Sequence, residues 1–424
     1  MSDKLNKKPV NGMKDVLPRE MEIRSWCMKV IRENYKSYGF TEIETPCVES
    51  IENLSSKQGG ENEKLIFKIL KRGEKLTSAL AQDAPAENSL VDSGLRYDLT
   101  LPLSRYYSNH ANELPVPFKA LQMGNVFRAE RPQKGRFRQF MQCDIDILGE
   151  PSELAEIELI LATCSTLGKL GFKNFKVRIN DRRILKAMAD HCGFSEDAFD
   201  SVCIILDKMD KIGLDGVRSE LVENGFSEDA VEKYTALLTG LQGAEDSLGY
   251  LKEALEGVLD PSVCEGLSVI KNSVLAAGQG FEMIFDPTLV RGMGYYTGTI
   301  FEVEIADFGS SVAGGGRYDK MVGRFTGKDT PACGFSIGFE RIVTILLDQD
   351  FKIPKEGSKV AFLLEKGLPA DKLAEAIAKA QERRDGGAQV LMVRMNKNKK
   401  FQKQQLEADG YTEFVDFYRE SLKN

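Results

Sequence analysis

The chain has few of the residues on which metal centres and charge-relay triads depend. Its 424 residues include two histidines, His110 and His191, and a single tryptophan. Two histidines leave little room for a histidine-based metal site or for a catalytic triad. We therefore expect chemistry that relies on other side chains.

Cysteines are present but lack the paired spacing of a zinc site. Several of them occupy apolar positions of helical patterns, which favours buried thiols over disulfides or metal ligands. The eight are Cys27, Cys47, Cys143, Cys164, Cys192, Cys203, Cys264 and Cys333.

Long hydrophobic runs are also missing. No apolar stretch approaches membrane-spanning length, and the N-terminal Met-Ser-Asp-Lys-Leu-Asn-Lys-Lys has no signal-peptide core. We expect a cytoplasmic protein of two or three domains, since 42% hydrophobic and 29% charged residues describe an ordinary soluble chain. The net charge of -7 argues against indiscriminate coating of nucleic acid, but it does not exclude local basic faces.

The most informative stretch runs from Phe127 to Gly149. Strands are predicted over 118–127 and 137–148, and Pro132 and Gly135 mark the loop between them, so the pattern indicates a long-looped antiparallel hairpin. Guanidinium groups bind planar oxyanions through paired hydrogen bonds. The cations that crowd the hairpin are Arg128, Arg131, Lys134, Arg136 and Arg138.

Acceptors follow these cations on the return strand. Gln142, Asp144 and Asp146 share one face, because strand side chains alternate. The hairpin thus offers cations for a polyphosphate and acceptors for a small cationic or amide-like group. A solvated hairpin of mixed charge is the alternative, and it is the commoner meaning of a charge run.

The string from Phe127 to Phe140, Phe-Arg-Ala-Glu-Arg-Pro-Gln-Lys-Gly-Arg-Phe-Arg-Gln-Phe, resembles the second signature motif of class II aminoacyl-tRNA synthetases. Its last ten residues look specifically like the histidyl-tRNA synthetase family, and the resemblance extends across most of residues 10–347. It implies an α+β fold, with an antiparallel-sheet catalytic domain, a helical insertion and a small C-terminal α/β domain. The implied activity is ATP-dependent ligation of L-histidine to tRNA(His) through a histidyl-adenylate.

The N-terminal segment resembles the first class II motif. A helix is predicted from Pro18 to a stop at Gly39, followed by a strand over 40–48 that carries Pro46. In the family this motif builds a dimer interface, so the resemblance implies a homodimer. Periodicity alone indicates only that the helix has one buried face.

Residues 95–105 predict a strand that gives way to a helix near Pro102, with Asp98 and Thr100 on one side. In the family this segment holds the α-amino group of the amino acid, which makes Asp98, Leu99 and Thr100 candidate histidine-binding residues. Taken alone, Asp98 would more often be a strand-end cap.

Residues 290–302, Val-Arg-Gly-Met-Gly-Tyr-Tyr-Thr-Gly-Thr-Ile-Phe-Glu, look like the histidine-specific signature of the family. The glycines allow close approach to a ligand, and a strand is predicted over 299–305. The resemblance places Arg291 against the α-phosphate, where related synthetases use another metal ion. It also places Tyr295 and Tyr296 in the histidine pocket.

Two further segments are expected to complete the pocket. Residues 314–319 predict a tight glycine-rich turn that delivers Tyr318, which with Tyr296 would wall the imidazole while Asp146 accepts its N–H; core aromatics are the alternative. Residues 334–347 resemble the third class II motif, a strand that enters an apolar helix with Arg341 placed to hold the γ-phosphate.

The predicted site therefore has two groups of residues, and Arg291 and Arg128 are the catalytic candidates. Mg²⁺ is expected on the ATP phosphates as part of the substrate, without a tightly bound cofactor or a protein metal site. The ATP-binding candidates are Arg128, Glu130, Arg136 and Arg341. The histidine-binding candidates are Asp98, Leu99, Thr100, Arg128, Gln142, Asp146, Arg291, Tyr295, Tyr296 and Tyr318.

The pattern of elements, read with the resemblance, predicts five parts. By resemblance, 1–175 and 285–347 form the catalytic domain, 176–284 a mainly helical insertion, 348–358 a linker and 359–424 a shortened anticodon-binding-like α/β domain. The insertion either reaches the tRNA acceptor stem, as in the family, or is a structural cap. The basic cluster of the last part either contacts the anticodon or is a solvated loop. It consists of Arg394, Lys397, Lys399, Lys400 and Lys403.

Two other functions are compatible with the resemblance. Synthetase-like paralogues serve as histidine-sensing regulatory subunits of ATP phosphoribosyltransferase and charge no tRNA. Arg128, Arg291 and Arg341 favour catalysis, since a sensor needs no phosphate clamp. A class II enzyme of another amino acid specificity is the second alternative, and the 291–302 string argues against it.

Overall fold

The computed structural model describes residues 5–55, 60–132, 136–278, 280–291, 294–305, 310–354 and 358–419. The chain divides into two compact units, one of residues 1–16 and 24–348 and the other of residues 17–23 and 349–424. The predicted hairpin-tip residues Lys134 and Gly135, and Gly292, lie outside the described residues. Within the described part, no helix combines the length and the apolar character needed to cross a membrane.

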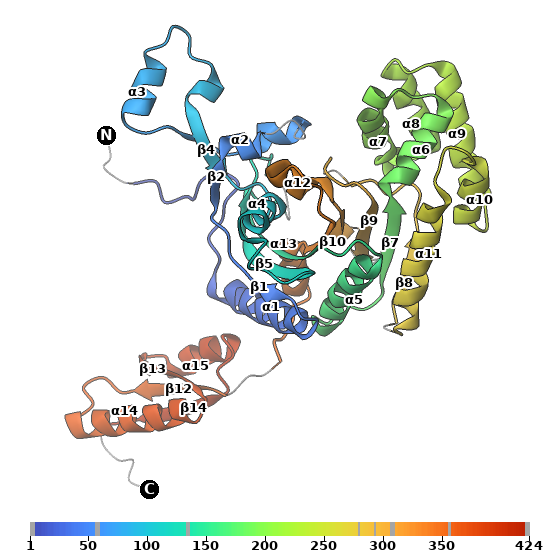
Figure 1. Ribbon diagram of the computed structural model, residues 1–424. Coiled ribbons are helices and arrows are strands. Elements are labelled where there is room, and N and C mark those ends of the chain that lie inside the picture. The colour runs from blue at the N-terminus through green and yellow to red at the C-terminus, as the bar shows by residue number, and fades with distance from the viewer. Residues whose placement is uncertain are drawn as a thin grey trace. The chain divides into compact units, whose positions relative to one another are not determined.

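The larger unit is built on a mixed sheet that has eight strands in the described residues (Figure 1). Its order is β1-β5-β6-β11-β10-β9-β7-β8, and only the β1–β5 and β7–β8 pairs are parallel. The predominantly antiparallel sheet expected from the sequence is confirmed. The strands are β1 (Thr41–Glu42), β5 (Phe118–Phe127), β6 (Gln139–Leu148), β7 (Phe175–Asp181), β8 (Glu282–Phe285), β9 (Thr299–Ile305), β10 (Ser310–Arg317) and β11 (Ala332–Ile337).

The hairpin β5–β6 lies near the middle of this sheet. Its strands pair without a register shift from Phe118 opposite Leu148 to Phe127 opposite Gln139. Continuous burial of residues 143–148 places this end of β6 between two covered faces. The predicted hairpin is confirmed, and its loop end carries the arginines.

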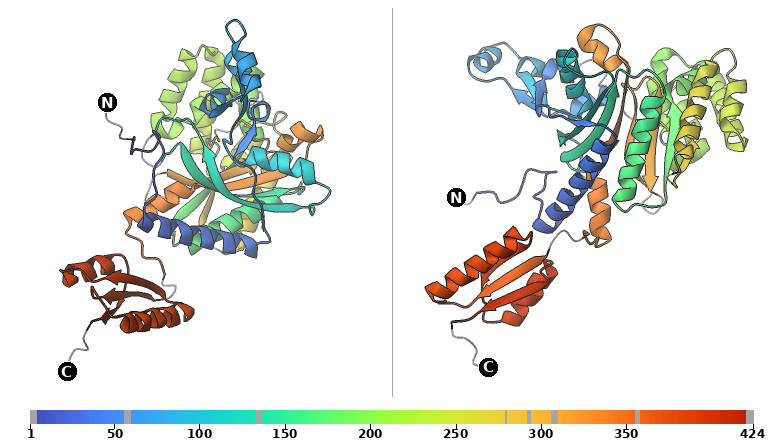
Figure 2. Two further views of the ribbon diagram at one scale, coloured as in Figure 1. Left: turned by 90° about the vertical axis from the view of Figure 1, so that its left-hand side faces the viewer. Right: turned by 60° about the horizontal axis from the view of Figure 1, so that its bottom comes forward.

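Helices cover one face of the sheet and leave the other face for a pocket. Helices α5 (Leu154–Lys169) and α13 (Phe339–Asp348) pack on β6, β10 and β11. Helix α1 (Pro18–Ser37) joins α5 through Asn34, whose side-chain amide donates to the carbonyl oxygen of Ala162 at 3.1 Å. Figure 2 shows α1, α5 and α13 on the same side of the sheet. On the other side, α4 (Thr100–His110) packs with α12 (Lys320–Thr326).

A small antiparallel sheet precedes α4 in the chain. It has the order β2-β4-β3, with β2 (Val48–Ser50), β3 (Lys68–Leu70) and β4 (Val91–Leu95), and it is accompanied by α2 (Ile51–Leu54) and α3 (Glu74–Leu80). The single strand predicted over 40–48 is wrong, because the chain leaves β1 at Glu42 and joins a different sheet at Val48. The polar, alanine-containing sequence after β3 favours a loop up to about Asn88, but the structure places α3 within it.

Successive helices fill the chain between the parallel neighbours β7 and β8, as the sequence predicted. Each of three helices begins at a residue whose side chain accepts from a backbone N–H: Asp181, Ser227 and Asp260. The helices are α6 (Arg182–Cys192), α7 (Phe199–Leu206), α8 (Met209–Glu223), α9 (Glu228–Gly243), α10 (Ser247–Ala254) and α11 (Pro261–Ala276).

The smaller unit is an alternating α/β structure around an apolar cluster that includes Val360 and Phe362. Its three strands in the described residues run parallel in the order β13-β12-β14. The elements are β12 (Lys359–Leu364), α14 (Ala370–Asp385), β13 (Gln389–Arg394), α15 (Lys399–Ala408) and β14 (Glu413–Phe417). In its basic cluster, Lys399 and Lys403 both contact Asp416, at 2.5 and 3.3 Å.

The eight cysteines are free thiols, and all of them except Cys47 are buried. The prediction of buried thiols is therefore confirmed for seven positions.

Candidate active site

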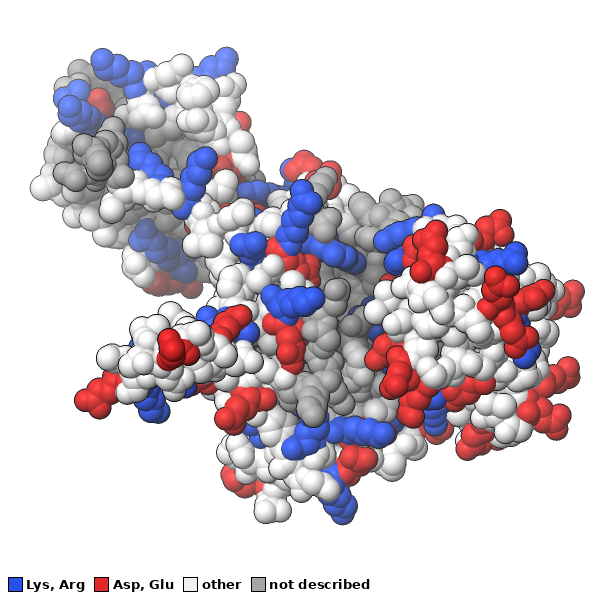
Figure 3. Space-filling view, turned by 90° about the horizontal axis from the view of Figure 1, so that it is seen from above, with Lys and Arg blue, Asp and Glu red and all other residues white. Residues whose placement is uncertain are grey.

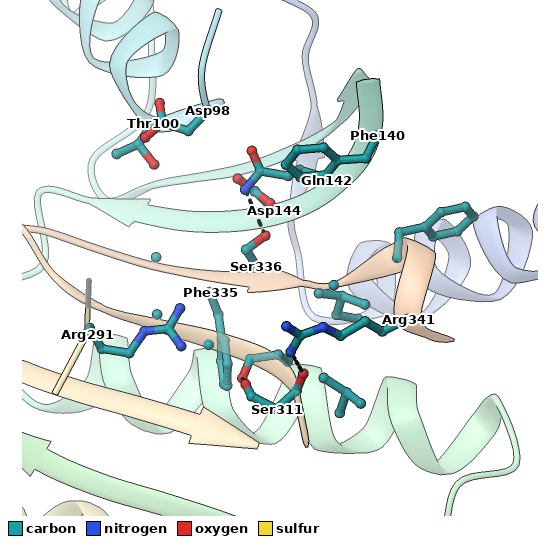
Figure 4. Close-up of a pocket in the computed structure, with 18 of the residues that line it drawn as sticks. Asp98, Thr100, Phe140, Gln142, Asp144, Arg291, Ser311, Phe335, Ser336 and Arg341 are labelled. Atoms are coloured by element: carbon teal, nitrogen blue, oxygen red, sulfur yellow. Dashed lines mark hydrogen bonds between the residues drawn. The ribbon is translucent and has the colours of Figure 1, made fainter. Parts of the chain in front are cut away.

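One pocket of about 430 Å³ gathers nearly all of the residues that the sequence singled out. Its walls come from the hairpin, the turn before α4, the strands β9 to β11 and the start of α13 (Figure 4). The candidates that line it are Asp98, Thr100, Arg128, Glu130, Arg136, Gln142, Asp146, Arg291, Tyr295, Tyr296, Tyr318 and Arg341.

Leu99 is the candidate that does not line this pocket. Its side chain is 1% exposed and belongs to the core, while its carbonyl oxygen accepts from the side-chain amide of Gln122 at 3.2 Å. This hydrogen bond holds the backbone of the turn that carries Asp98 in place.

The turn from Arg96 to Leu99 holds Asp98 at the pocket. The strand predicted through this segment is wrong beyond Leu95, because β4 ends there and α4 begins at Thr100. Asp98 accepts from the backbone N–H of Leu101 through Oδ1 at 3.2 Å, and its Oδ2 receives the hydroxyl of Tyr295 at 3.5 Å. The same carboxyl therefore supports the start of the helix and faces the pocket.

Three arginines from distant parts of the chain line the pocket together. Arg128 lies over the ring of Tyr97, 4.2 Å from its centroid, and donates from Nε to the carbonyl oxygen of Tyr97 at 3.2 Å. Arg291 contacts Glu302, with 2.6 Å between Nη1 and Oε2, and Arg341 donates to the carbonyl oxygen of Ser311. In Figure 4, Arg291 and Arg341 extend along the floor from opposite sides.

A cluster of positive charge surrounds the Arg341 end. Burial lowers the pKa of Arg341, and the neighbouring Arg136 charge lowers it further. Among the residues that the structure describes, Arg136 contacts the carboxylate of Glu130 at 3.9 Å. Cations that repel one another across a pocket form a suitable site for a multiply charged anion.

Carboxyl groups occupy the opposite part of the pocket. Burial raises the pKa of Asp146 to about 7, against the lowering effect of Tyr318, whose hydroxyl donates to Oδ1 at 2.6 Å. Asp144, between Gln142 and Asp146 on the same strand face, also lines the pocket, and burial followed by the Asp146 charge raises its pKa well above the usual value. Sequence reasoning placed Asp144 on this face but did not include it among the site residues.

Glycines in the strand floor make room for these side chains. The turn predicted over 314–319 is wrong, because residues 314–316 lie inside β10 and pair with both β9 and β11. A Cβ atom at Gly314 would overlap the guanidinium of Arg291, and one at Gly334 would overlap Oδ1 of Asp146. Tyr318 follows the end of β10, and its hydroxyl reaches Asp146 from there.

Aromatic rings close the side of the pocket near Asp98 and Asp146. The ring centroids of Tyr295 and Tyr296 lie 4.9 Å apart, and Tyr295 meets Tyr318 edge to face at 6.0 Å. The hydroxyls of Tyr295 and Thr100 are 3.4 Å apart. An apolar slot with a few polar groups at its rim suits a small ring that carries hydrogen-bonding atoms.

No group of three or more His, Cys, Asp and Glu side chains that could hold a metal ion occurs within the described ranges. The charges of the pocket are instead divided between an arginine end and a carboxyl end.

An antiparallel sheet with this hairpin, and a strand that leads into a helix beginning near Arg341, define the catalytic domain of a class II aminoacyl-tRNA synthetase. The family model described as histidyl-tRNA synthetase matches residues 12–342. The chain belongs to the histidyl-tRNA synthetase family.

Curated relatives agree with this family. The chain is 43% identical over 418 residues to the histidine–tRNA ligase of Leifsonia xyli subsp. xyli (strain CTCB07), which covers 96% of this chain and 94% of the relative. It is 46% identical over 358 residues to the probable histidine–tRNA ligase of Tropheryma whipplei (strain Twist), covering 82% of each. The histidine–tRNA ligase of Porphyromonas gingivalis (strain ATCC BAA-308 / W83) is 37% identical over 382 residues, covering 88% of this chain and 84% of the relative.

Solved structures show the same fold. A histidyl-tRNA synthetase from Nostoc sp. PCC 7120 superposes with a TM-score of 0.75 at 27% identity, covering 96% of this chain and 90% of that chain. A structure described as an ATP phosphoribosyltransferase regulatory subunit/histidyl-tRNA synthetase from Bacillus halodurans C superposes with a TM-score of 0.76. This second structure is 20% identical in sequence and covers 97% of this chain and 98% of that chain, so the similarity establishes only the fold.

Proposed function

We propose that this chain ligates L-histidine to tRNA(His) with ATP, through a histidyl-adenylate intermediate. The observation that carries the proposal is that one pocket brings Arg128, Arg136, Arg291 and Arg341 together with buried carboxyls and tyrosines. The arginines suit a triphosphate, and the carboxyls and tyrosines suit an amino acid with a polar ring. Family membership makes these the expected ligands.

In the first step, the carboxylate of histidine attacks the α-phosphorus of ATP, and pyrophosphate leaves. This carboxylate is already ionised near neutral pH, so the step needs no strong protein base. The pocket has to place the two reactants and to stabilise the negative charge that grows on the phosphate oxygens. A site rich in arginine meets both needs.

Each arginine has a role in this proposal. Arg291 meets the α-phosphate, where its charge stabilises the transition state, and Arg128 holds the same phosphate and the attacking carboxylate. Arg341 holds the γ-phosphate, and Arg136 with Glu130 borders the nucleotide. The mutual repulsion of Arg136 and Arg341 supports an anionic ligand between them.

The carboxyl end binds histidine. We assign the imidazole to Asp146, whose Oδ1 is occupied by the Tyr318 hydroxyl and whose second oxygen is left for the ring N–H. Tyr295 and Tyr296 pack beside the ring, and the α-ammonium group lies against Asp98 and Thr100. Buried polar partners of this kind reject ligands that lack the matching hydrogen bond, by roughly four powers of ten in favourable cases.

Mg²⁺ enters with ATP and neutralises part of its phosphate charge. In this proposal the ion belongs to the nucleotide, since Mg²⁺ is usually bound through substrate phosphates and keeps several of its waters.

In the second step, a terminal ribose hydroxyl of tRNA attacks the activated carbonyl. We propose residues 1–175 and 285–347 as the catalytic domain, 176–284 as the insertion and 359–424, after the linker 348–358, as the shortened anticodon-binding-like domain. In Figure 3, Lys and Arg side chains border the central hollow, whereas Asp and Glu side chains are frequent over the helical segment at the right. We therefore favour the border of the hollow as the path of the tRNA end.

We also propose a homodimer in the cytoplasm. The support for the dimer is the likeness of α1 and the strands after it to the first class II motif. The support for the location is that the proposed reaction consumes ATP and tRNA. The molar mass of the purified protein in solution tests the dimer directly.

Histidine-dependent exchange of pyrophosphate into ATP, followed by charging of tRNA(His), tests the function. We expect both activities. Histidine binding without exchange would instead support a histidine-sensing regulatory subunit, and exchange with another amino acid would support a different class II specificity.

A further inference from the structure

The carboxyl group of Asp144 lies in the pocket wall with one oxygen unpartnered. The residue is 4% exposed, and its Oδ1 is buried without a hydrogen-bond donor among the residues that the structure describes. Figure 4 shows the side chain directed into the pocket from β6. A buried acceptor that lacks a donor lowers the stability of the folded state, so its presence calls for an explanation.

A second unpartnered acceptor lies beside the first. Gln142, two residues earlier on the same strand face, donates from Nε2 to the Ser336 hydroxyl at 3.2 Å, and its Oε1 is buried without a donor. Residues two apart on a strand are about 7 Å from each other at their Cα atoms. Both side chains can therefore meet one ligand group that has at least two N–H donors.

The nearby arginines are engaged with other groups, although the charge of Arg128 acts on Asp144 and lowers its pKa somewhat. Arg291 is paired with Glu302, and Arg128 lies over Tyr97 and donates to its carbonyl oxygen. Within the described residues, Oδ1 of Asp144 accepts no hydrogen bond, from Lys, Arg or any other donor. A donor in direct contact with this oxygen has to arrive with the ligand.

We propose that Asp144 is a further substrate-contact residue, which accepts a hydrogen bond from the α-ammonium group of the amino acid. This inference rests on the proposed function and deepens it. An ammonium group has three N–H donors, enough for Asp144, Gln142 and Asp98 together, whereas a neutral imidazole has one. The ring also has its own acceptor in Asp146, which Tyr318 orients.

The consequence is that the site selects amino acids with a free, charged α-amino group. A deaminated analogue would leave the Asp144 carboxyl buried without a cation, and a neutral N-acyl group would bring a single donor. Both ligands should be rejected through Asp144 even where the imidazole is bound correctly.

The test compares two ligands on two matched variants. Asp144→Asn and Asp146→Asn make the same change two residues apart on one strand face. Calorimetry then measures binding of L-histidine and of 3-(imidazol-4-yl)propanoate, which lacks the ammonium group. We expect Asp144→Asn to weaken L-histidine about tenfold or more and to leave the deaminated analogue within about twofold. Asp146→Asn should weaken both ligands.

If Asp144→Asn weakened the binding of both ligands equally, the assignment to the α-ammonium group would be overturned. Asp144 would then contact the imidazole instead. An unchanged affinity for L-histidine would overturn it as well. Circular dichroism and thermal unfolding establish that the variants fold. If Asp144→Asn does not fold, Asp144→Ala is titrated with the same two ligands, and the same outcomes apply. Failure of the unaltered protein to bind L-histidine would count against the proposed function itself, which keeps the two failures distinct.

Discussion

The guanidinium of Arg291 is fixed by the carboxylate of Glu302, with 2.6 Å between Nη1 and Oε2 inside the pocket. Glu302 lies on β9, and its other oxygen is 4.0 Å from Arg178, so one carboxylate stands between two cations. A charged group that is fixed before the reaction begins needs no reorganisation in the transition state. Glu302 therefore acts as a positioning residue for Arg291.

We predict that Glu302→Gln lowers kcat for pyrophosphate exchange about tenfold and changes the KM for histidine much less. The amide keeps the shape of the side chain but loses the charge that orients Arg291. Glu304→Gln is the matched control, because Glu304 lies two residues along β9 and contacts Lys176 at 3.5 Å. Equal losses in the two variants would show a general effect on the strand.

Removing the positive charge of Arg291 should slow the reaction more than removing the charge of Glu302. We predict that Arg291→Ala leaves the fold intact and slows adenylate formation at least about a hundredfold, the size seen when a preorganised transition-state donor is lost. Arg291→Lys keeps a positive charge without the planar guanidinium fork. Its rate of adenylate formation should lie between those of the unaltered protein and Arg291→Ala. Pyrophosphate exchange at saturating histidine and ATP measures both, and an unchanged rate for Arg291→Ala would refute the role.

Much of this arrangement could be predicted from the sequence, because it depends on local patterns. The hairpin strands are ten residues each, with alternating side chains, and both segments were located within two residues of β5 and β6. The entry of β11 into α13 was likewise visible as an apolar strand followed by an amphipathic helix.

Features that depend on neighbouring strands could not be predicted. Three successive glycines favour a turn when they are considered alone, yet Gly314 to Gly316 lie in β10. Glycine is needed there because Arg291 and β11 approach the strand too closely for a Cβ atom. Whether the carboxyl of Asp144 is paired depends on Ser336 across the sheet, which lies 192 positions later in the chain. Only the folded sheet brings these groups together.

The imidazole assignment yields a prediction on substrate affinity. Asp146→Ala should raise the KM for histidine far more than the KM for ATP, since the carboxyl faces the amino acid end of the pocket. Tyr318→Phe removes only the hydroxyl that orients Asp146 at 2.6 Å, so its effect should be smaller and in the same direction. Equal increases in both KM values for Asp146→Ala would contradict the assignment.

The buried carboxyls of the pocket also predict how stability depends on pH. Burial raises the pKa of Asp98, Asp144 and Asp146 in the folded protein, and Asp146 reaches about 7. A carboxyl whose pKa is higher in the folded state binds more protons there, so its effect on stability becomes less favourable as the pH rises from about 4 through the folded pKa. The titratable and charged groups near Asp144 are Asp146, Asp98, Arg128, Tyr295, Tyr35 and Cys143.

We therefore predict that Asp144→Asn stabilises the ligand-free protein at pH 8, by roughly a few degrees in Tm, and has little effect at pH 4. The amide removes a group whose charged form is disfavoured by burial, and this penalty grows as the pH rises, whereas at low pH the native carboxyl is already neutral. Thermal unfolding at both pH values measures the difference. Because L-histidine supplies the missing cation, saturating ligand should raise Tm more in the unaltered protein than in the variant. A lower Tm of Asp144→Asn at pH 8 would mean that the carboxylate is paired within the fold, and it would contradict this explanation of the pocket.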